Sequence, residues 1–376
     1  MNKITILLFG LLLVACSKEV KNGKTIFLDS EETKQLRLSN ILHNERYIPL
    51  ETNDNCIIGY INKIQIYDNV IYILDSFFSK KLFAFDLKGK YIHTISQKGH
   101  GPGEYIDITD FVISDNKIYI LNGRTSIIEF DINGKFLKEE KLHFQVDFIF
   151  KNAFDSWVLV TNSDKSPDHK YNVYVTDKNY EIKKGLIESV YSEFNIQPFQ
   201  QLCTYKDTNY FYLPLENIVY SVNNNVLKKK YELKYPRNCI LSANEFSTYK
   251  KMELQERIKI LDATILLTNI IITKPMTFFF YRKKKETYIY TIDNENQQIF
   301  LVAEKNIIND IDGTEKIPKL YYSISEKNIV GCLFPNDLVK DSTAIRKINP
   351  KLNSLIKNFS NEKNPIISIY SVNERK

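Results

Sequence analysis

The sequence contains few of the residues that mark disulfide-rich, collagen-like or low-complexity proteins. Its 376 residues include five cysteines, 12 glycines and 11 prolines. So few cysteines exclude a disulfide framework as the main source of stability, and so few glycines and prolines exclude fibrous or disordered designs. Hydrophobic residues make up 43% of the chain and charged residues 26%, as in ordinary globular proteins. We therefore expect a folded domain with a substantial core.

The cysteines divide into Cys16 near the N-terminus and four others that are widely spaced. Four cysteines allow three disulfide pairings if the chain is exported to an oxidising compartment. Dispersed cysteines also serve as small buried hydrophobic residues, and this is the interpretation we favour. The four are Cys56, Cys203, Cys239 and Cys332.

Local motifs for metal binding or nucleophilic catalysis are also missing. The histidines never stand two or four residues apart, so no local zinc site is present, although ligands distant in sequence could still meet in the fold. Asp310–Glu315 begins like a calcium loop but lacks the third ligand position and the later glutamate, and we interpret it as a turn. The chain has no G-x-S-x-G serine hydrolase motif. We predict no catalytic residue, metal or cofactor. The histidines are His43, His93, His100, His143 and His169.

The net charge of the chain is small. The 51 Lys and Arg exceed the 45 Asp and Glu by six, and this excess is spread along the chain. We therefore expect no nucleic-acid partner. Beyond Cys16, no apolar run is long and charge-free enough to span a membrane. What is abundant is aromatic: 24 Tyr and 23 Phe favour β-strands over helices.

An internal repeat organises the chain. Ile71–Asp75 returns as Ile118–Asn122, 47 residues later, and Phe85–Lys90 returns as Phe130–Lys135, 45 residues later. Each copy combines short apolar strands with tight turns. A period of about 40 to 50 residues built in this way is typical of β-propeller blades. The fold class is therefore predicted to be all-β, a β-propeller.

Later copies of the repeat are degenerate but keep the period. The turn at Asp131 recurs after 46 residues at Asp177, after another 46 at Asn223, and then after 70 at Asp293. The longer interval contains a run with the form of a helix capping box at its start, so we predict a helical insertion at about residues 242–262, between blades four and five. This spacing predicts six blades, with seven as the main alternative.

The ring of a propeller must close, because an open sheet edge would be left unpaired. We expect Tyr47–Glu51 to supply the outer strand of the last blade, beside Ile366–Val372. The predicted organisation is a signal peptide at 1–15, a polar tether at 16–24 and the propeller at 25–376.

The N-terminus has the form of a lipoprotein signal. A basic residue, Lys3, precedes the apolar stretch Ile4–Val14, and Leu13-Val14-Ala15-Cys16 matches the bacterial lipobox. We expect acylation of Cys16, which makes the lipid bilayer a partner; an ordinary signal peptide is the alternative. Ser17-Lys18-Glu19 resembles the short charged signal that directs lipoproteins of Bacteroidetes to the outer face of the outer membrane.

The loop after the first blade, Gln97–Tyr105, reads Q-K-G-H-G-P-G-E-Y. Together with the lipobox and a last strand that begins Asn364-Pro365, this loop resembles the six-bladed β-propeller lipoproteins of Bacteroides and relatives, an NHL-like group. The resemblance covers nearly the whole mature chain and implies a propeller fold and an envelope location. It implies no activity, because members of this family largely lack an assigned one.

The same loop supplies the candidate ligand-face residues. They are His100, Glu104, Tyr105, Asp107 and Asp110. The alternative is structural: glycines let the backbone turn sharply and Glu104 accepts backbone N–H groups at a crossover between blades. A dinucleotide site is excluded, because the loop is followed by a predicted strand where that site needs a helix.

Taken together, these features predict an envelope lipoprotein that acts as a non-catalytic binding or scaffold propeller for a glycan, a peptide or an envelope protein. One alternative is a glycan hydrolase or lyase with carboxylates and histidines converging at the central channel. Another is an accessory subunit of an outer-membrane transporter. Titratable groups gathered at the channel mouth would favour the enzyme, an exposed aromatic rim would favour binding, and a large apolar patch would favour the transporter subunit.

Overall fold

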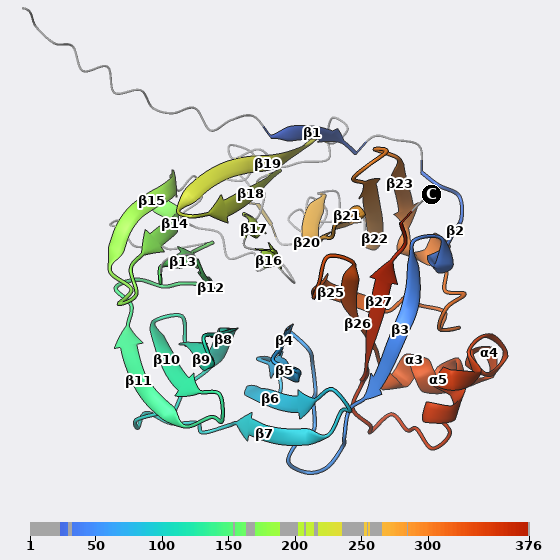
Figure 1. Ribbon diagram of the computed structural model, residues 1–376, viewed down its shortest axis with the longest axis horizontal. Coiled ribbons are helices and arrows are strands. Elements are labelled where there is room, and N and C mark those ends of the chain that lie inside the picture. The colour runs from blue at the N-terminus through green and yellow to red at the C-terminus, as the bar shows by residue number, and fades with distance from the viewer. Residues whose placement is uncertain are drawn as a thin grey trace, which may run out of the picture.

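The computed structural model describes residues 23–374, apart from 29–31, 153–154, 163–169, 189–201, 207, 214–216, 235–251, 254, 256–264 and 284. The described chain forms a ring of six β-sheets around a central axis, as Figure 1 shows. The predicted six-bladed β-propeller is therefore confirmed. The predicted helical insertion at 242–262 lies outside the described residues, apart from isolated positions.

Blades one to three each contain four antiparallel strands that follow one another in sequence from the axis outward. They are β4 (Lys63–Tyr67), β5 (Val70–Asp75), β6 (Lys81–Asp86) and β7 (Tyr91–Ile95); β8 (Ile108–Ser114), β9 (Lys117–Asn122), β10 (Ser126–Asp131) and β11 (Phe136–Lys141); and β12 (Phe148–Lys151), β13 (Trp157–Val160), β14 (Tyr171–Thr176) and β15 (Ile182–Glu188).

Blades four to six keep this plan with additions at their edges. Their strands are β16 (Leu202–Tyr205), β17 (Thr208–Tyr212), β18 (Ile218–Asn223), β19 (Val226–Lys234) and β1 (Lys24–Phe27); β20 (Leu266–Ile272), β21 (Met276–Lys283), β22 (Glu286–Asp293) and β23 (Ile299–Ala303); and β25 (Lys319–Ser323), β26 (Asn328–Leu333), β27 (Ile366–Val372) and β3 (Leu42–Pro49).

Short elements fill the spaces between blades. A two-stranded parallel sheet joins the N-terminal segment to the end of blade five, and three helices connect β26 to β27. These elements are β2 (Leu36–Arg37), β24 (Ile307–Ile308), η1 (Leu38–Asn40), η2 (Glu304–Asn306), α3 (Pro335–Lys340), α4 (Ser342–Ile348) and α5 (Pro350–Leu355).

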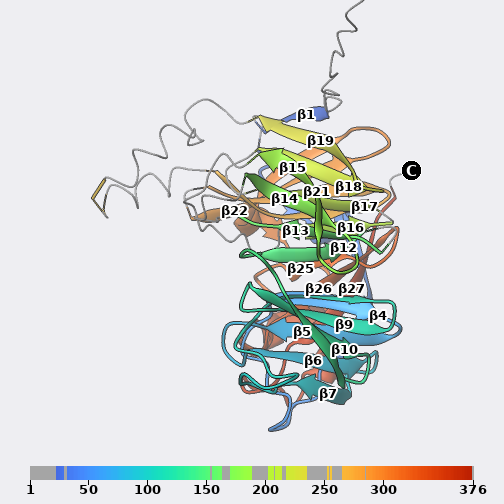
Figure 2. The same ribbon diagram turned by 90° about the vertical axis from the view of Figure 1, so that its left-hand side faces the viewer.

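The direction of the strands gives the ring two different faces, seen edge-on in Figure 2. Face A carries the turns that follow the inner strands, and face B carries the crossovers between blades. Several face A turns have both central residues at positive φ, as type I′ hairpins require: Asp68-Asn69 at 44° and 62°, Asp115-Asn116 at 52° and 56°, and Asn224-Asn225 at 49° and 60°. Asp and Asn tolerate this conformation, which explains their recurrence in the repeat.

The N-terminal strand closes the ring as predicted. β3 pairs antiparallel with β27 and forms the outer edge of blade six, with Ile48 opposite Ile367 and Leu42 opposite Val372. The inner edge of that blade is β25, so the first and last segments of the chain complete one sheet.

The earlier strand, β1, has a role that the sequence did not reveal. It pairs in parallel with β19, Lys24 opposite Tyr231, and adds a fifth strand to the outer edge of blade four. The N-terminal segment therefore covers the edges of two blades, four and six.

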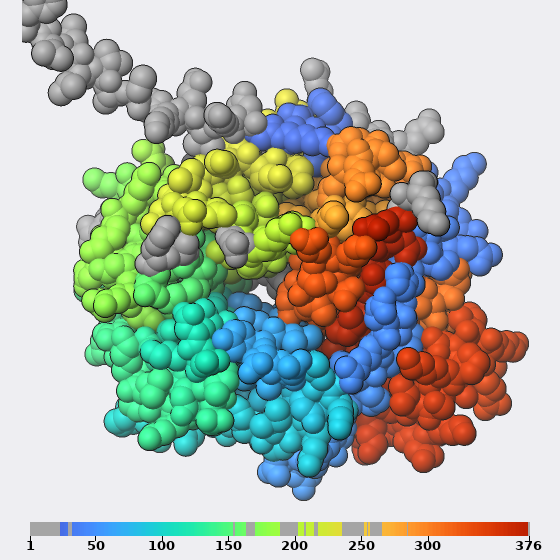
Figure 3. Space-filling model, in the orientation of Figure 1, coloured from blue at the N-terminus to red at the C-terminus, as the bar shows by residue number. Residues whose placement is uncertain are grey.

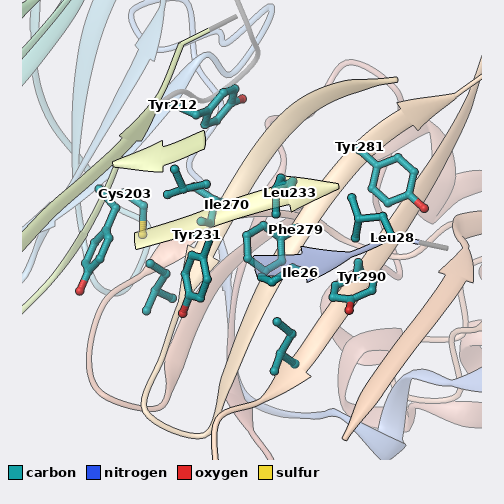
Figure 4. Packing of buried hydrophobic residues seen from close by; sticks show 14 of the residues in the cluster. Ile26, Leu28, Cys203, Tyr212, Tyr231, Leu233, Ile270, Phe279, Tyr281 and Tyr290 are labelled. Atoms are coloured by element: carbon teal, nitrogen blue, oxygen red, sulfur yellow. The ribbon is translucent and has the colours of Figure 1, made fainter. Parts of the chain in front are cut away.

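The core lies between neighbouring blades rather than in one central mass. The interface of blades four and five, shown in Figure 4, buries aromatic and aliphatic side chains from β1, β19, β21 and β22. Tyr231 meets Phe279 edge to face at 5.3 Å between ring centroids. The abundance of aromatic residues is thus largely explained by packing between sheets.

Candidate functional site

The inner strands leave a channel at the centre of the ring, and Figure 3 shows the hollow between the blades. Its volume is 640 Å³. Residues from β4, β8, β12, β16, β25 and the adjoining turns of face A line it.

The charged residues that line the channel all have ionic partners. Lys63 Nζ lies 2.7 Å from Asp110 Oδ1, and Lys206 Nζ lies 2.8 Å from Glu326 Oε1. Lys151 Nζ lies 3.4 Å from Asp155 and 3.8 Å from Asp115. Pairing of this kind offsets part of the cost of removing the charges from water. These residues do not form the converging set of acids and bases that would indicate catalysis at this end.

Asp110, one of the predicted ligand-face residues, links three blades. It is 2% exposed. Besides the Lys63 contact from blade one, its Oδ2 accepts a hydrogen bond from the backbone N–H of Ile149 in blade three, at 3.0 Å. A buried carboxylate needs such partners to offset its desolvation. Asp110 therefore holds inner strands together.

An exposed aromatic group lies on face B, in the turn between β5 and β6. Phe77 and Phe78 are 71% and 67% exposed. Their ring centroids are 5.3 Å apart in an edge-on arrangement, and the ring of Tyr60 lies 6.4 Å from that of Phe77. We call these three residues the aromatic platform. Large apolar side chains exposed together mark interaction sites more often than singly exposed ones do.

A buried carboxylate fixes the backbone of the aromatic platform. Asp75 is fully buried and ends β5. Its Oδ2 accepts the N–H groups of Gly59 at 2.9 Å and Tyr60 at 3.2 Å, and its Oδ1 accepts those of Phe77 at 3.2 Å and Phe78 at 2.9 Å. A further bond from the N–H of Ser79 measures 3.3 Å. Charge-assisted bonds of this kind hold both chain segments in place before any ligand arrives.

Lys319 at the start of β25 borders the aromatic platform. Its Nζ lies 4.8 Å from the ring centroid of Tyr60 and 5.3 Å from that of Tyr321. Nζ also donates a hydrogen bond to the Tyr60 hydroxyl at 3.3 Å. Burial lowers the pKa of Lys319 to about 8.

A second cavity, of 350 Å³, lies between blades five and six and includes Lys319 in its lining. Glu304 also lines it, and burial raises the pKa of this carboxyl above its usual range. The cavity is in the size range of small-molecule sites. The cavity contains one base and one acid of altered pKa, and Lys319 connects it to Tyr60 of the aromatic platform.

The glycine-rich loop contacts the end of the turn that carries Phe77 and Phe78. Tyr105 is fully buried, and its hydroxyl donates to the carbonyl of Lys80 at 2.6 Å, at the end of the Phe77–Phe78 turn. Glu104 Oε2 accepts the N–H of Gly101 at 2.9 Å within the loop. These bonds match the crossover role that was the alternative interpretation of this loop.

The remaining candidates in the loop lie at the surface. Asp107 Oδ1 lies 3.5 Å from Lys80 Nζ, and His100 is exposed. The five predicted residues therefore do not gather around one ligand position. Glu104, Tyr105 and Asp110 bond within the protein, and the ligand-face role of the set stays a prediction.

Four residues of this region, Tyr60, Phe77, Phe78 and Lys319, were not predicted from the sequence. A signal for two of them was present. The repeat offset falls from 47 at Asp75 to 45 at Phe85, so blade one has two extra residues between these positions. That insertion is the turn that carries Phe77 and Phe78.

Cys203 lines the central channel and Cys332 lines the second cavity. Cys56, Cys203 and Cys332 are buried free thiols, and Cys239 lies outside the described residues. Within the described residues no group of three His, Cys, Asp or Glu side chains is placed to hold a metal ion. None of the helices in that part of the chain reaches the length and hydrophobicity of a membrane-spanning segment.

Comparison with known families decides the affiliation of the chain. Residues 24–371 match a family described as a domain of unknown function, DUF4934. The chain belongs to the DUF4934 family. No curated protein sequence matches it significantly.

One solved structure shows the same fold. It is an inferred exported protein from Bacteroides fragilis, 20% identical, with a TM-score of 0.80 over 94% of this chain and all of that chain. At this identity the likeness supports the fold alone. A Saccharomyces cerevisiae complex of Dbp5 with Nup159 and Gle1 scores 0.41 at 12% identity, over 83% of this chain and 80% of that one, which is too remote to inform function.

Proposed function

We propose that this DUF4934 protein is an exported, lipid-anchored binding propeller whose aromatic platform contacts the ligand. The observation that carries the proposal is the pair Phe77 and Phe78, more than two-thirds exposed and yet held in place by the buried Asp75. A backbone that is already fixed before the ligand arrives loses little entropy on binding. The same turn in blade two has no such residues, so the platform is an addition to the repeat.

The chemistry of the aromatic platform favours a ligand with an apolar face. Aromatic rings stack on the C–H faces of sugars and on the apolar side chains of peptides, and Lys319 adds a cation close to Tyr60. A glycan, a peptide or an envelope protein therefore fits this surface. Binding is preferred over catalysis because the charged residues that line the channel are engaged in ion pairs.

The proposed cellular location rests on the N-terminal sequence. The lipobox Leu13–Cys16 predicts an acylated Cys16, and the exported relative from Bacteroides fragilis supports passage into the envelope. Attachment to the outer membrane, display on its outer face through Ser17-Lys18-Glu19, and kinship with the NHL-like lipoproteins of Bacteroides are parts of the proposal. Replacing Cys16 with Ala is expected to release the protein from the membrane fraction; continued attachment would contradict the anchor.

Binding is tested by co-purification in mild detergent from the native envelope, together with a glycan array probed with the same tagged full-length protein. We expect the amount of bound species recovered with Phe77→Ala/Phe78→Ala to fall at least tenfold relative to the unaltered protein. A matched control, Leu137→Ala/Ile182→Ala, removes two hydrophobic side chains that are 44% and 43% exposed on outer strands. Equal losses in both variants would contradict the proposal. A stoichiometric transporter among the recovered proteins would assign the accessory-subunit role instead.

An enzyme that cleaves glycans is the second candidate, favoured by the altered pKa values of Lys319 and Glu304 in one cavity. In that role the two groups would exchange protons with the substrate. Glu304→Gln would then abolish turnover of array glycans while binding to the aromatic platform persists. Lack of turnover by the unaltered protein on every bound glycan would exclude this candidate.

A further inference from the structure

A basic groove lies on face A between blades four and five. Its lining does not include the channel residues that form the ion pairs described above. Its volume is 580 Å³. Five lysines line it, from β1, β19 and the turn after β20, together with three tyrosines. They are Lys24, Lys228, Lys229, Lys230, Lys274, Tyr205, Tyr210 and Tyr231.

The positive charge of the groove is not offset by its own lining. No Asp or Glu is found among the described residues that line it. Lys228, Lys230, Lys24 and Lys274 are exposed, and Lys229 is half-buried. The chain as a whole has an excess of only six positive charges, so five lysines in one groove form a local concentration.

An irregular pairing brings the consecutive lysines together. Side chains of a regular strand alternate between the two faces of the sheet, so neighbours would point apart. Between β18 and β19 the register shifts, with Val219 opposite Tyr231 but Tyr220 opposite Lys229, which leaves Lys230 as the extra residue. Such a bulge re-aims side chains, and all three lysines reach the groove.

The N-terminal tether enters the fold at the same groove. Gly23 is part of the lining, and a β-carbon placed on it would lie 2.7 Å from the carbonyl oxygen of Lys229. Figure 1 shows β1 beside β19 at this edge of the ring. Six residues lie between Cys16 and Gly23, and the seven Cα–Cα steps that join the two span at most about 25 Å when fully extended. An acylated Cys16 would therefore keep the groove close to the bilayer surface.

We propose that the groove binds the anionic phosphate headgroups of the bilayer in which Cys16 is anchored. The inference rests on the lipid anchor of the proposed function. Each lysine near an anionic surface contributes about a factor of five to affinity. Headgroup contact turns the blade four and five edge of face A toward the membrane. The aromatic platform, on face B, then faces away from it.

The test uses the chain from Ser17 onward, which retains every described residue and carries no acyl group. Its binding to vesicles of seven parts phosphatidylcholine to three parts phosphatidylglycerol is measured by sedimentation at low salt, with pure phosphatidylcholine vesicles as reference. The groove variant is Lys228→Gln/Lys230→Gln/Lys274→Gln. The control is Lys88→Gln/Lys90→Gln/Lys135→Gln, which removes the same charge from exposed face A turns of blades one and two.

We expect binding to the anionic vesicles alone, about a 100-fold loss in the groove variant, and little change in the control. Inorganic phosphate at equal phosphate concentration should not displace the protein from the vesicles. Equal losses in both variants would show that the binding depends on net charge and not on the groove. Binding to dextran sulfate without binding to vesicles would assign the groove to a soluble polyanion. Either result overturns the proposal. Because this chain lacks Cys16, failure here is distinct from failure of the anchor, which the Cys16→Ala fractionation reports.

Discussion

Blades one and two share two sequence motifs, and each ends its second strand with a buried polar residue that binds the backbone of the segment entering the blade. In blade two, Asn122 Oδ1 accepts the N–H groups of Ile106 at 2.9 Å and Asp107 at 3.4 Å. In blade one, Asp75 accepts those of the equivalent residues, Gly59 and Tyr60, and three more from its own turn. The carboxylate offers a second oxygen, and that oxygen orders the turn that presents Phe77 and Phe78.

The difference shows how a repeat gains a binding surface. In both blades the polar residue at the end of the second strand accepts the N–H groups of the segment that enters the blade. In blade one, the turn that follows this residue is longer by two residues and exposes Phe77 and Phe78 to solvent. The short turn of blade two, Gly123–Thr125, instead directs Arg124 to Asp147 at 2.8 Å, a contact that stabilises the next blade. The same position in the repeat therefore serves stability in blade two and, in our proposal, recognition in blade one.

The largest effect is expected from removing these two polar residues. Asp75→Ala leaves five backbone N–H groups without their acceptor and should lower the free energy of unfolding by about 3–5 kcal/mol. Asn122→Ala removes two such bonds and should cost about 1–2 kcal/mol. Chemical denaturation of both variants measures the difference. A larger loss in Asn122→Ala would show that the two contacts are not ranked as we describe.

The third turn of each blade gives a sharper comparison. Gly89 and Gly134 both have φ of +85° in equivalent turns. A β-carbon at Gly89 would lie 2.0 Å from the carbonyl oxygen of Pro49 in the closing strand, whereas at Gly134 the nearest atom is 3.5 Å away. Gly134→Ala should therefore cost about 1 kcal/mol, from backbone strain alone.

Gly89→Ala adds a clash with the strand that closes the ring, and should cost at least about 2 kcal/mol more than Gly134→Ala. Thermal unfolding of the two variants, monitored by circular dichroism, checks the ranking. Equal melting temperatures would mean that the turn of blade one is not packed against β3 as described.

A pH-dependent effect of intermediate size is expected beside the aromatic platform. The pKa of Lys319 is about 8 in the folded protein and 10.5 in its ordinary environment. Between these values the unfolded chain binds the proton more tightly than the folded chain does. Burial of this ammonium therefore costs stability in full below pH 8, and the cost is relieved as pH rises from 8 to 10.5, so the unfolding free energy increases over this range. Relative to Lys319→Met, the unfolding free energy should rise by about 1–2 kcal/mol from pH 7.5 to 9.5. A constant or falling difference would contradict the burial of this ammonium.

The smallest effect on stability is expected where the effect on binding is largest. Phe77→Ala/Phe78→Ala removes side chains that are mostly exposed, so the free energy of unfolding should change by less than about 0.5 kcal/mol. Denaturation in urea measures it. A loss of more than about 2 kcal/mol, the scale of truncating a buried side chain, would show that these rings are part of the core. The reduced binding of the variant would then need another explanation.

Much of the fold could be predicted because the repeat is local. Ile71–Asp75 and its copy carry their own turn residues, and Asp115-Asn116 can be recognised as a type I′ turn without any tertiary information. The pairing of Tyr47–Leu50 with the last strand also followed, since a ring has only one open edge to close.

The candidate site could not be predicted to the same extent, because it depends on contacts between blades. Nothing near Asp110 in sequence reveals that Lys63 and Ile149 approach it from two other blades. Tyr105 lies in a glycine-rich loop that looks exposed, yet its hydroxyl bonds to Lys80, 25 residues away. The parallel pairing of β1 with β19 is equally non-local. The two extra residues of the turn that carries Phe77 and Phe78 could be seen as a change in the repeat offset. Only the structure shows that Asp75 binds the backbone of this turn and that both rings are exposed.

The most direct test of the aromatic platform places a photoreactive p-benzoylphenylalanine at position 78 of the full-length protein in its native envelope, with Leu137, an exposed residue on β11, substituted in the same way as control. We predict a distinct and saturable crosslinked species, glycan or protein, from position 78 and none of it from position 137. The same species from both positions, or none from position 78, would show that the aromatic platform is not where this propeller binds.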